Sequence, residues 1–136
     1  MTPQKPDFSG EYVLNRQAST LSPGADAVRT ARLRITHRDP NVRMEGKFEF
    51  EGNAFEYSME LVADGREVAG QDGRSTTSLR WENDALLFLD RTNGPGSPVT
   101  MSWRYELQDG GRRLMATEDM RGGGRDQHNV WVFERS

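Results

Sequence analysis

The sequence predicts an all-β protein: a single closed antiparallel up-and-down barrel of about ten strands, with a short irregular or helical segment after the first strand. From residue 31 onwards, short runs alternate apolar and polar residues, and helical apolar spacing is nowhere sustained. Turns rich in Gly, Asp and Asn separate these runs, from Asp39-Pro40-Asn41 to Gly122-Gly123-Gly124. A meander of this kind must close or stack to hide its edge strands.

The turn positions set the limits of each expected strand. The interval between the first two strands, residues 16–30, lacks strand character. Ser22-Pro23-Gly24 breaks the chain there, and residues 25–29 are expected to form about one helical turn. The expected strands are 8–15, 31–38, 42–50, 54–63, 66–69, 75–82, 85–92, 99–107, 112–120 and 126–135.

Length and composition exclude several classes of protein. At 136 residues, the chain is expected to form one β-barrel domain over 1–136. A net charge of -3 lacks the basic footprint of a nucleic-acid-binding protein. The sequence has 0 cysteines, which excludes disulfides and thiolate metal sites. It contains no apolar run of membrane-spanning length, and it predicts nothing about oligomeric state.

The first residues, Met1-Thr2-Pro3-Gln4-Lys5-Pro6, have no apolar signal core. As written, the chain is therefore expected to be cytoplasmic, or exported if a signal peptide has been removed.

Both ends of the chain resemble known barrels. The opening Phe8-Ser9-Gly10-Glu11-Tyr12-Val13-Leu14 resembles the Gly-x-Trp strand of the calycin superfamily, which includes lipocalins and fatty-acid-binding proteins. The final Val130-Trp131-Val132-Phe133-Glu134-Arg135 resembles the family's closing strand. The resemblance implies a ten-stranded barrel in which Tyr12, in place of the Trp, packs against Arg135 as a cation–π pair.

One departure from that family bears on the ligand. Fatty-acid-binding proteins anchor a carboxylate with Arg-x-Tyr on the last strand, where this chain has Trp131 and Phe133. A buried carboxylate without a partner costs several kcal/mol. The resemblance, with this departure, therefore implies a neutral, aromatic ligand rather than a fatty acid.

Strand alternation indicates which side chains face the barrel interior. The resemblance places Asn129, Trp131 and Phe133 inside, and counting across the turns adds the neighbouring strands. Asp119 and Asn129 are expected just inside the mouth, at the end that holds the longest connections, and Asp90 or Arg91 is expected to join them. The expected ligand wall is Phe48, Tyr57, Met59, Trp103, Tyr105, Met115, Thr117, Asn129, Trp131 and Phe133.

Three functional hypotheses follow from this interior. The leading one is binding of a small, mostly apolar, aromatic molecule, because aromatic walls with few polar groups are typical of ligand sites. The second is a cofactor-free isomerase, cyclase or eliminase with Asp119 as general base and Asn129, Tyr105 or Thr117 stabilising an oxyanion. The third is a non-catalytic interaction domain whose barrel is filled by side chains.

The two histidines are expected to be structural. His128 is predicted to lie opposite Glu118 on the solvent face, and His37 to stabilise a turn with Asp39. With no cysteine and two distant histidines, neither a zinc site nor any cofactor is expected.

Overall fold

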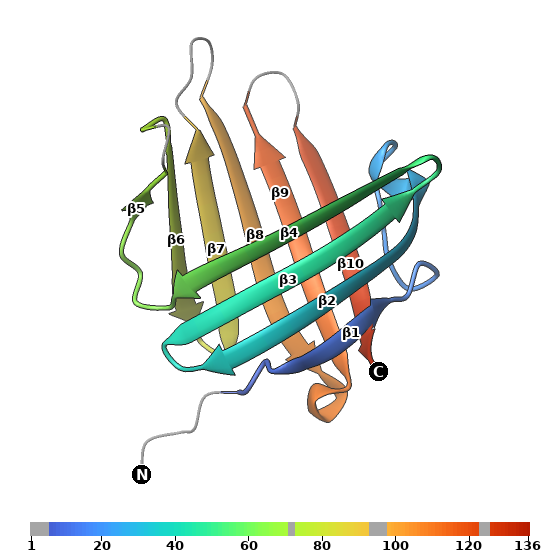
Figure 1. The fold of residues 1–136 in the computed structure, drawn as a ribbon, viewed down its shortest axis with the longest axis horizontal. Helices are drawn as coiled ribbons and strands as arrows, with labels where there is room; N and C mark the ends of the chain where they lie inside the picture. The colour runs from blue at the N-terminus through green and yellow to red at the C-terminus, as the bar shows by residue number, and fades with distance from the viewer. Residues whose placement is uncertain (1–5, 71–72, 93–97, 123–125) are drawn as a thin grey trace.

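The computed structural model describes residues 6–70, 73–92, 98–122 and 126–136, which form one curled antiparallel sheet (Figure 1). Two short 3-10 segments, η1 (Ala25–Ala27) and η2 (Asp109–Gly111), interrupt the strands. The strands are β1 Gly10–Leu14, β2 Val28–Arg38, β3 Asn41–Phe50, β4 Asn53–Val62, β5 Val68–Ala69, β6 Ser75–Glu82, β7 Ala85–Thr92, β8 Val99–Gln108, β9 Arg113–Arg121 and β10 Gln127–Arg135.

The strand order is that of an up-and-down barrel, β4-β3-β2-β1-β10-β9-β8-β7-β6-β5. The all-β antiparallel prediction is therefore confirmed. Closure is only partial, because β4 and β5 are the two edges of the ladder and no pairing joins them among the described residues. Figure 1 shows the layer of β1 to β4 crossing in front of β7 to β10, so that the two halves of the sheet face each other.

The strand limits follow the turns that the sequence marks. β6 and β7 have the predicted bounds, and every other strand end lies within three residues of its predicted position. The largest difference is at β2, which begins at Val28 because the helical turn before it is only the three residues of η1. The register of β2 against β3 shifts between Val28 and Thr30, which marks a bulge at this early start.

The core follows from strand alternation. Along β2, Ala31, Leu33 and Ile35 are buried while Arg32 and Arg34 are exposed, because successive side chains point to opposite faces. The largest fully buried side chains come from both halves of the sheet. They are Tyr12, Phe8, Phe133, Ile35, Met44, Leu79, Leu86, Leu114, Val28, Val42 and Asn129.

The first and last strands are joined by the contact that the resemblance implied. Tyr12 lies opposite Arg135, whose guanidinium carbon is 5.3 Å from the centroid of the Tyr12 ring. Arg135 also donates to the Tyr12 hydroxyl at 2.8 Å, and that hydroxyl donates to the carbonyl of Phe8 at 2.7 Å. A Cβ on Gly10 would lie 3.3 Å from the same guanidinium carbon, so glycine leaves room for Arg135 to cross β1.

His37 connects several segments next to the β2–β3 turn. Its Nδ1 accepts from the Phe8 backbone N–H at 3.2 Å, and its Nε2 lies 3.4 Å from Asp39 Oδ1. The Trp81 indole N–H donates to the same Asp39 oxygen at 2.9 Å. His37 thus does contact Asp39 as predicted, and its buried ring also packs 5.9 Å from Phe8 and 5.6 Å from Trp81.

Candidate functional site

A cavity of about 420 Å³ lies between the two halves of the sheet. Most of its lining residues are aromatic, and the others are methionines and acidic residues. β3 and β4 supply one wall, and β7 to β10 supply the other. The lining residues are Phe48, Phe50, Phe55, Tyr57, Met59, Phe88, Asp90, Met101, Trp103, Tyr105, Glu118 and Trp131.

The aromatic rings contact one another across the barrel. Phe48 on β3 meets Trp131 on β10 edge to face, with ring centroids 5.4 Å apart. Trp131 lies 6.4 Å from Trp103, which stacks on Tyr105 at 6.1 Å. Such ring pairs add about 0.5–1.5 kcal/mol each beyond the apolar area they bury. The wall is therefore held in shape by contacts between its own rings.

Glu118 is fixed on this wall by two N–H donors. Its Oε1 accepts from the Trp131 indole at 3.1 Å and from the Asn129 amide at 3.0 Å. Glu118 lies opposite Trp103 on one side and Asn129 on the other, so the pairing of β9 within the sheet directs its carboxylate inward. The aromatic cavity thus holds a carboxylate, that of Glu118, whose orientation is fixed by hydrogen bonds.

Asn129 links that carboxylate to the segment between β1 and β2. Its Oδ1 accepts from the Ser22 backbone N–H at 2.6 Å, while its amide donates to Glu118. Thr20 forms an isolated bridge with Val130, and the Ser19 hydroxyl accepts from the Val132 N–H at 2.9 Å. The irregular segment is therefore attached along the start of β10 by hydrogen bonds.

The structure brings six of the predicted wall residues to the cavity. Asp90 also lies there, as one of the two alternatives named from the sequence, whereas Arg91 is exposed. Phe133 and Asn129 have the predicted inward orientation but are buried outside the cavity lining. Participation of all these residues in ligand binding stays a prediction. The six are Phe48, Tyr57, Met59, Trp103, Tyr105 and Trp131.

The prediction for β9 is wrong by one residue. Met115, Thr117 and Asp119 were expected inside, but they pair with Val132, Val130 and His128 on the outer face. The inward residues of β9 are Leu114, Ala116 and Glu118, which pair with Phe133, Trp131 and Asn129. A one-residue change of register moves every side chain of a strand to the other face.

The surface histidine has a different partner from the one predicted. His128 Nδ1 lies 2.7 Å from Asp119 Oδ1, and the His128 side chain is 59% exposed. The solvent-facing position of His128 agrees with the prediction, but Glu118 is not its neighbour. Asp119, the predicted general base, is therefore engaged on the outside of the barrel.

Several cavity residues were absent from the predicted wall. Met101 and Phe88 could have been found by alternation, since Met101 lies two positions before Trp103 and Phe88 two before Asp90. Phe50 and Phe55 continue the alternation of Phe48 and Tyr57 in the same way. Glu118 had no such signal, because both faces of its strand offer one carboxylate.

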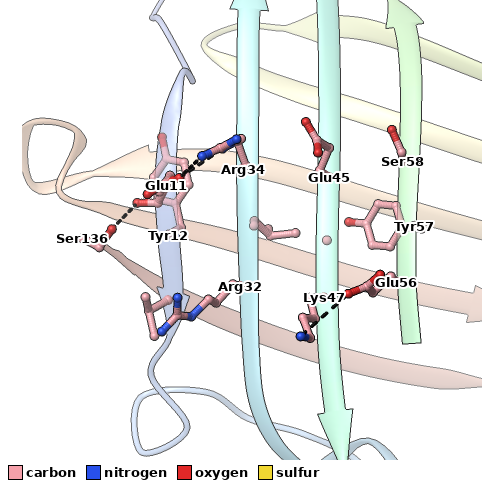
Figure 2. Close-up of a pocket in the computed structure, with 13 residues that line it drawn as sticks. Glu11, Tyr12, Arg32, Arg34, Glu45, Lys47, Glu56, Tyr57, Ser58 and Ser136 are labelled. Carbon is pink, nitrogen blue, oxygen red and sulfur yellow. Dashed lines mark hydrogen bonds and ion pairs between the residues drawn. The ribbon is translucent and has the colours of Figure 1, made fainter. Parts of the chain in front are cut away.

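A second hollow, of about 590 Å³, lies on the outer side of β1 to β4. Figure 2 shows its charged side chains on either side of Tyr12 and Tyr57. Arg34 pairs with Glu11 at 2.5 Å and Lys47 with Glu56 at 3.8 Å, all with exposed side chains. Exposed ion pairs of this kind contribute little. The smaller aromatic cavity is the better candidate for a ligand site, because its lining is mainly apolar with few polar groups.

The two tyrosines of the cavity resist ionisation because they are buried. Burial raises the pKa of Tyr57 to about 12. Burial also raises the pKa of Tyr105 well above its ordinary value, helped by the neighbouring Tyr57 and by the charge of Glu118. Tyr12, at the β1–β10 contact, has its pKa raised by burial against the opposing effect of its Arg135 hydrogen bond. All 3 tyrosines of the chain are therefore shifted in the same direction.

These shifts predict a loss of stability in alkali. Tyrosines ionise near pH 10 in the unfolded chain and at higher pH in the folded one, so folding becomes less favourable as pH rises above about 10. For Tyr57, the loss approaches about 2–3 kcal/mol by pH 12. Urea unfolding at successive pH values should show it, and Tyr57→Phe should remove its share. A native phenol that titrates near pH 10 by absorbance would contradict the prediction.

Within the described residues, no group of three or more His, Cys, Asp or Glu side chains converges as a metal site. Nor does any helix in the described part of the chain have the length and apolar character needed to cross a bilayer.

The strand order, the β1–β10 pairing and the aromatic cavity define the class of fold: a ten-stranded antiparallel up-and-down sheet curled into a partly closed barrel. Solved structures support this assignment. The chain is similar to human cellular retinol-binding protein IV, with a TM-score of 0.68 and 16% identity over 96% of this chain and 99% of that one. No family model and no curated protein matches the sequence.

Two further solved structures share the fold. The fluorescent protein UnaG matches with a TM-score of 0.58 and 19% identity, over 95% of this chain and 97% of that one. The REP1-NXSQ fatty acid transporter matches with a TM-score of 0.59 and 14% identity, over 95% of this chain and 96% of that one. At these identities the likeness is one of fold, and the calycin resemblance expected from the sequence is confirmed at that level.

Proposed function

We propose that this protein binds a small, mostly apolar, aromatic molecule inside the barrel. The observation that carries the proposal is the cavity of about 420 Å³ lined by the rings of β3, β4 and β7 to β10. A ligand that enters the cavity would remove apolar surface from water, which stabilises the complex by roughly 25 cal/mol for each Å² buried. The named functions of the structural neighbours, retinol binding and fatty acid transport, are of the same general kind.

The alternatives from the sequence have less support. The catalytic hypothesis placed Asp119 in the cavity as a general base, whereas Asp119 pairs with His128 on the outer face. The filled-barrel hypothesis requires side chains to occupy the interior, and the cavity argues against it. Binding is therefore the function that the geometry supports best.

Tryptophan fluorescence offers a direct test, because two of the 3 tryptophans line the cavity and the third, Trp81, packs against Phe8 and His37 outside it. Titration with aromatic probes is expected to change the emission saturably. Trp81→Phe should retain this response, and Trp103→Phe should lose much of it. Silence across a panel of aromatic and hydrophobic dyes, or an unchanged response in Trp103→Phe, would refute the proposal.

A further inference from the structure

The charged side chains on the cavity wall share one sign. Glu118 and Asp90 both line the aromatic cavity, from β9 and β7. The sequence-based expectation of a neutral ligand rested on the missing cationic anchor for an acid. The structure adds the oriented carboxylate of Glu118 in that same space, and this group favours a ligand that brings positive charge or N–H donors.

The carboxylate of Glu118 is oriented but not neutralised by its partners. Both of its donors, the Trp131 indole and the Asn129 amide, are uncharged, and both bond Oε1. Among the described residues, no hydrogen bond or ion pair joins Oε2. Glu118 is partly buried, and a partly desolvated charge gains from a partner of opposite sign that also hydrogen-bonds it.

The neighbouring rings suit the same kind of ligand. Trp103 pairs directly with Glu118 across β8 and β9, and it stacks on Tyr105. An ammonium group beside an indole face is attracted by the ring quadrupole, and the attraction strengthens when both are desolvated. A carboxylate and a tryptophan side by side thus form a site for a cation with an apolar body.

We propose that the cavity ligand is an aromatic amine whose ammonium group pairs with Glu118 while its rings contact the aromatic wall. This inference rests on the proposed binding function and specifies its ligand class. A carboxylate ligand is disfavoured by the same geometry, because it would approach Glu118 with like charge.

The test compares three ligands with one apolar body: 1-naphthylmethylamine, 1-naphthalenemethanol and 1-naphthoate. Isothermal titration calorimetry at pH 7 with the wild-type chain is expected to give the amine about 10- to 100-fold tighter binding than the alcohol, the range for a hydrogen bond to a charged group. The naphthoate should bind most weakly. Equal binding of amine and alcohol, or tightest binding of the naphthoate, would overturn the amine proposal even if no variant folds.

Two matched variants locate the effect. Glu118→Gln keeps a side chain that can accept from Trp131 and Asn129, and it should reduce the amine's advantage about 10-fold or more without weakening the alcohol. Asp119→Asn removes the same charge one residue away on the outer face and should leave all three ligands unchanged. Equal weakening of amine and alcohol by Glu118→Gln would assign Glu118 a structural role instead. Failure of all three ligands to bind would refute the proposed function itself.

Discussion

Gly46→Ala is expected to lower the free energy of unfolding by about 1–3 kcal/mol and to weaken ligand binding. Gly46 lies opposite Tyr57, whose ring covers the β3 backbone, and a Cβ there would come within 2.3 Å of the Tyr57 ring atom Cε1. The added methyl must displace the ring, and Tyr57 is part of the cavity wall. Urea unfolding and probe titration measure the two effects.

A double-mutant cycle separates this steric effect from an ordinary loss of stability. In a Tyr57→Ala background the ring is gone, so Gly46→Ala should cost about 1 kcal/mol less than it does in the wild type. Strictly additive costs of the two substitutions would mean that the ring does not depend on glycine at position 46.

Tyr12→Ala is expected to lower the free energy of unfolding by about 3–5 kcal/mol, because it empties a fully buried aromatic site. Tyr12→Phe should cost about 1–2 kcal/mol, since it keeps the ring but loses the hydroxyl that donates to Phe8 and accepts from Arg135. Denaturant unfolding of both variants measures how the β1–β10 contact divides between packing and hydrogen bonding.

Val13→Ala is the matched control for this pair, since Val13 is the next residue on β1 and is 36% exposed. It should change stability by about 0.5 kcal/mol or less. If Tyr12→Phe cost as much as Tyr12→Ala, the ring would contribute nothing of its own. If Tyr12→Ala is too unstable to purify, the phenylalanine variant still reports the hydroxyl's contribution.

The strands could be predicted from the sequence because each carries its own signals. A run such as 101–107 alternates Met, Trp, Tyr and Leu with polar residues, so its buried face is defined without reference to any neighbour. Turn residues then mark where the run must stop. These are local properties, and the structure reproduces them closely in β6, β7 and β8.

The pairing register between neighbouring strands was harder to predict, because it depends on the number of residues in each turn. Tyr105 pairs with Ala116, and Ala116 with Trp131, so each turn differs by one residue from the spacing expected. The two differences cancel across β9. Trp103 and Tyr105 therefore have the predicted orientation, while Met115, Thr117 and Asp119 do not.

Composition offered no help in choosing the inner face of β9. One face carries Leu114, Ala116 and Glu118, and the other carries Met115, Thr117 and Asp119. Each has an aliphatic residue, a small residue and a carboxylate in the same order. Since the two faces are chemically so similar, only the hydrogen-bonded register distinguishes the acid inside the cavity from the one outside.

Asn129 must be a hydrogen-bond acceptor and a donor at once. Its side-chain oxygen accepts from the Ser22 backbone N–H, and its amide nitrogen donates to Glu118. An aspartate at 129 would still accept from the Ser22 N–H but would repel the Glu118 carboxylate. A leucine would form neither hydrogen bond. A substitution at position 129 therefore changes the hydrogen bonding of Glu118 and that of the segment between β1 and β2 at the same time. A single side chain thus joins the carboxylate of the cavity wall to the irregular segment after β1.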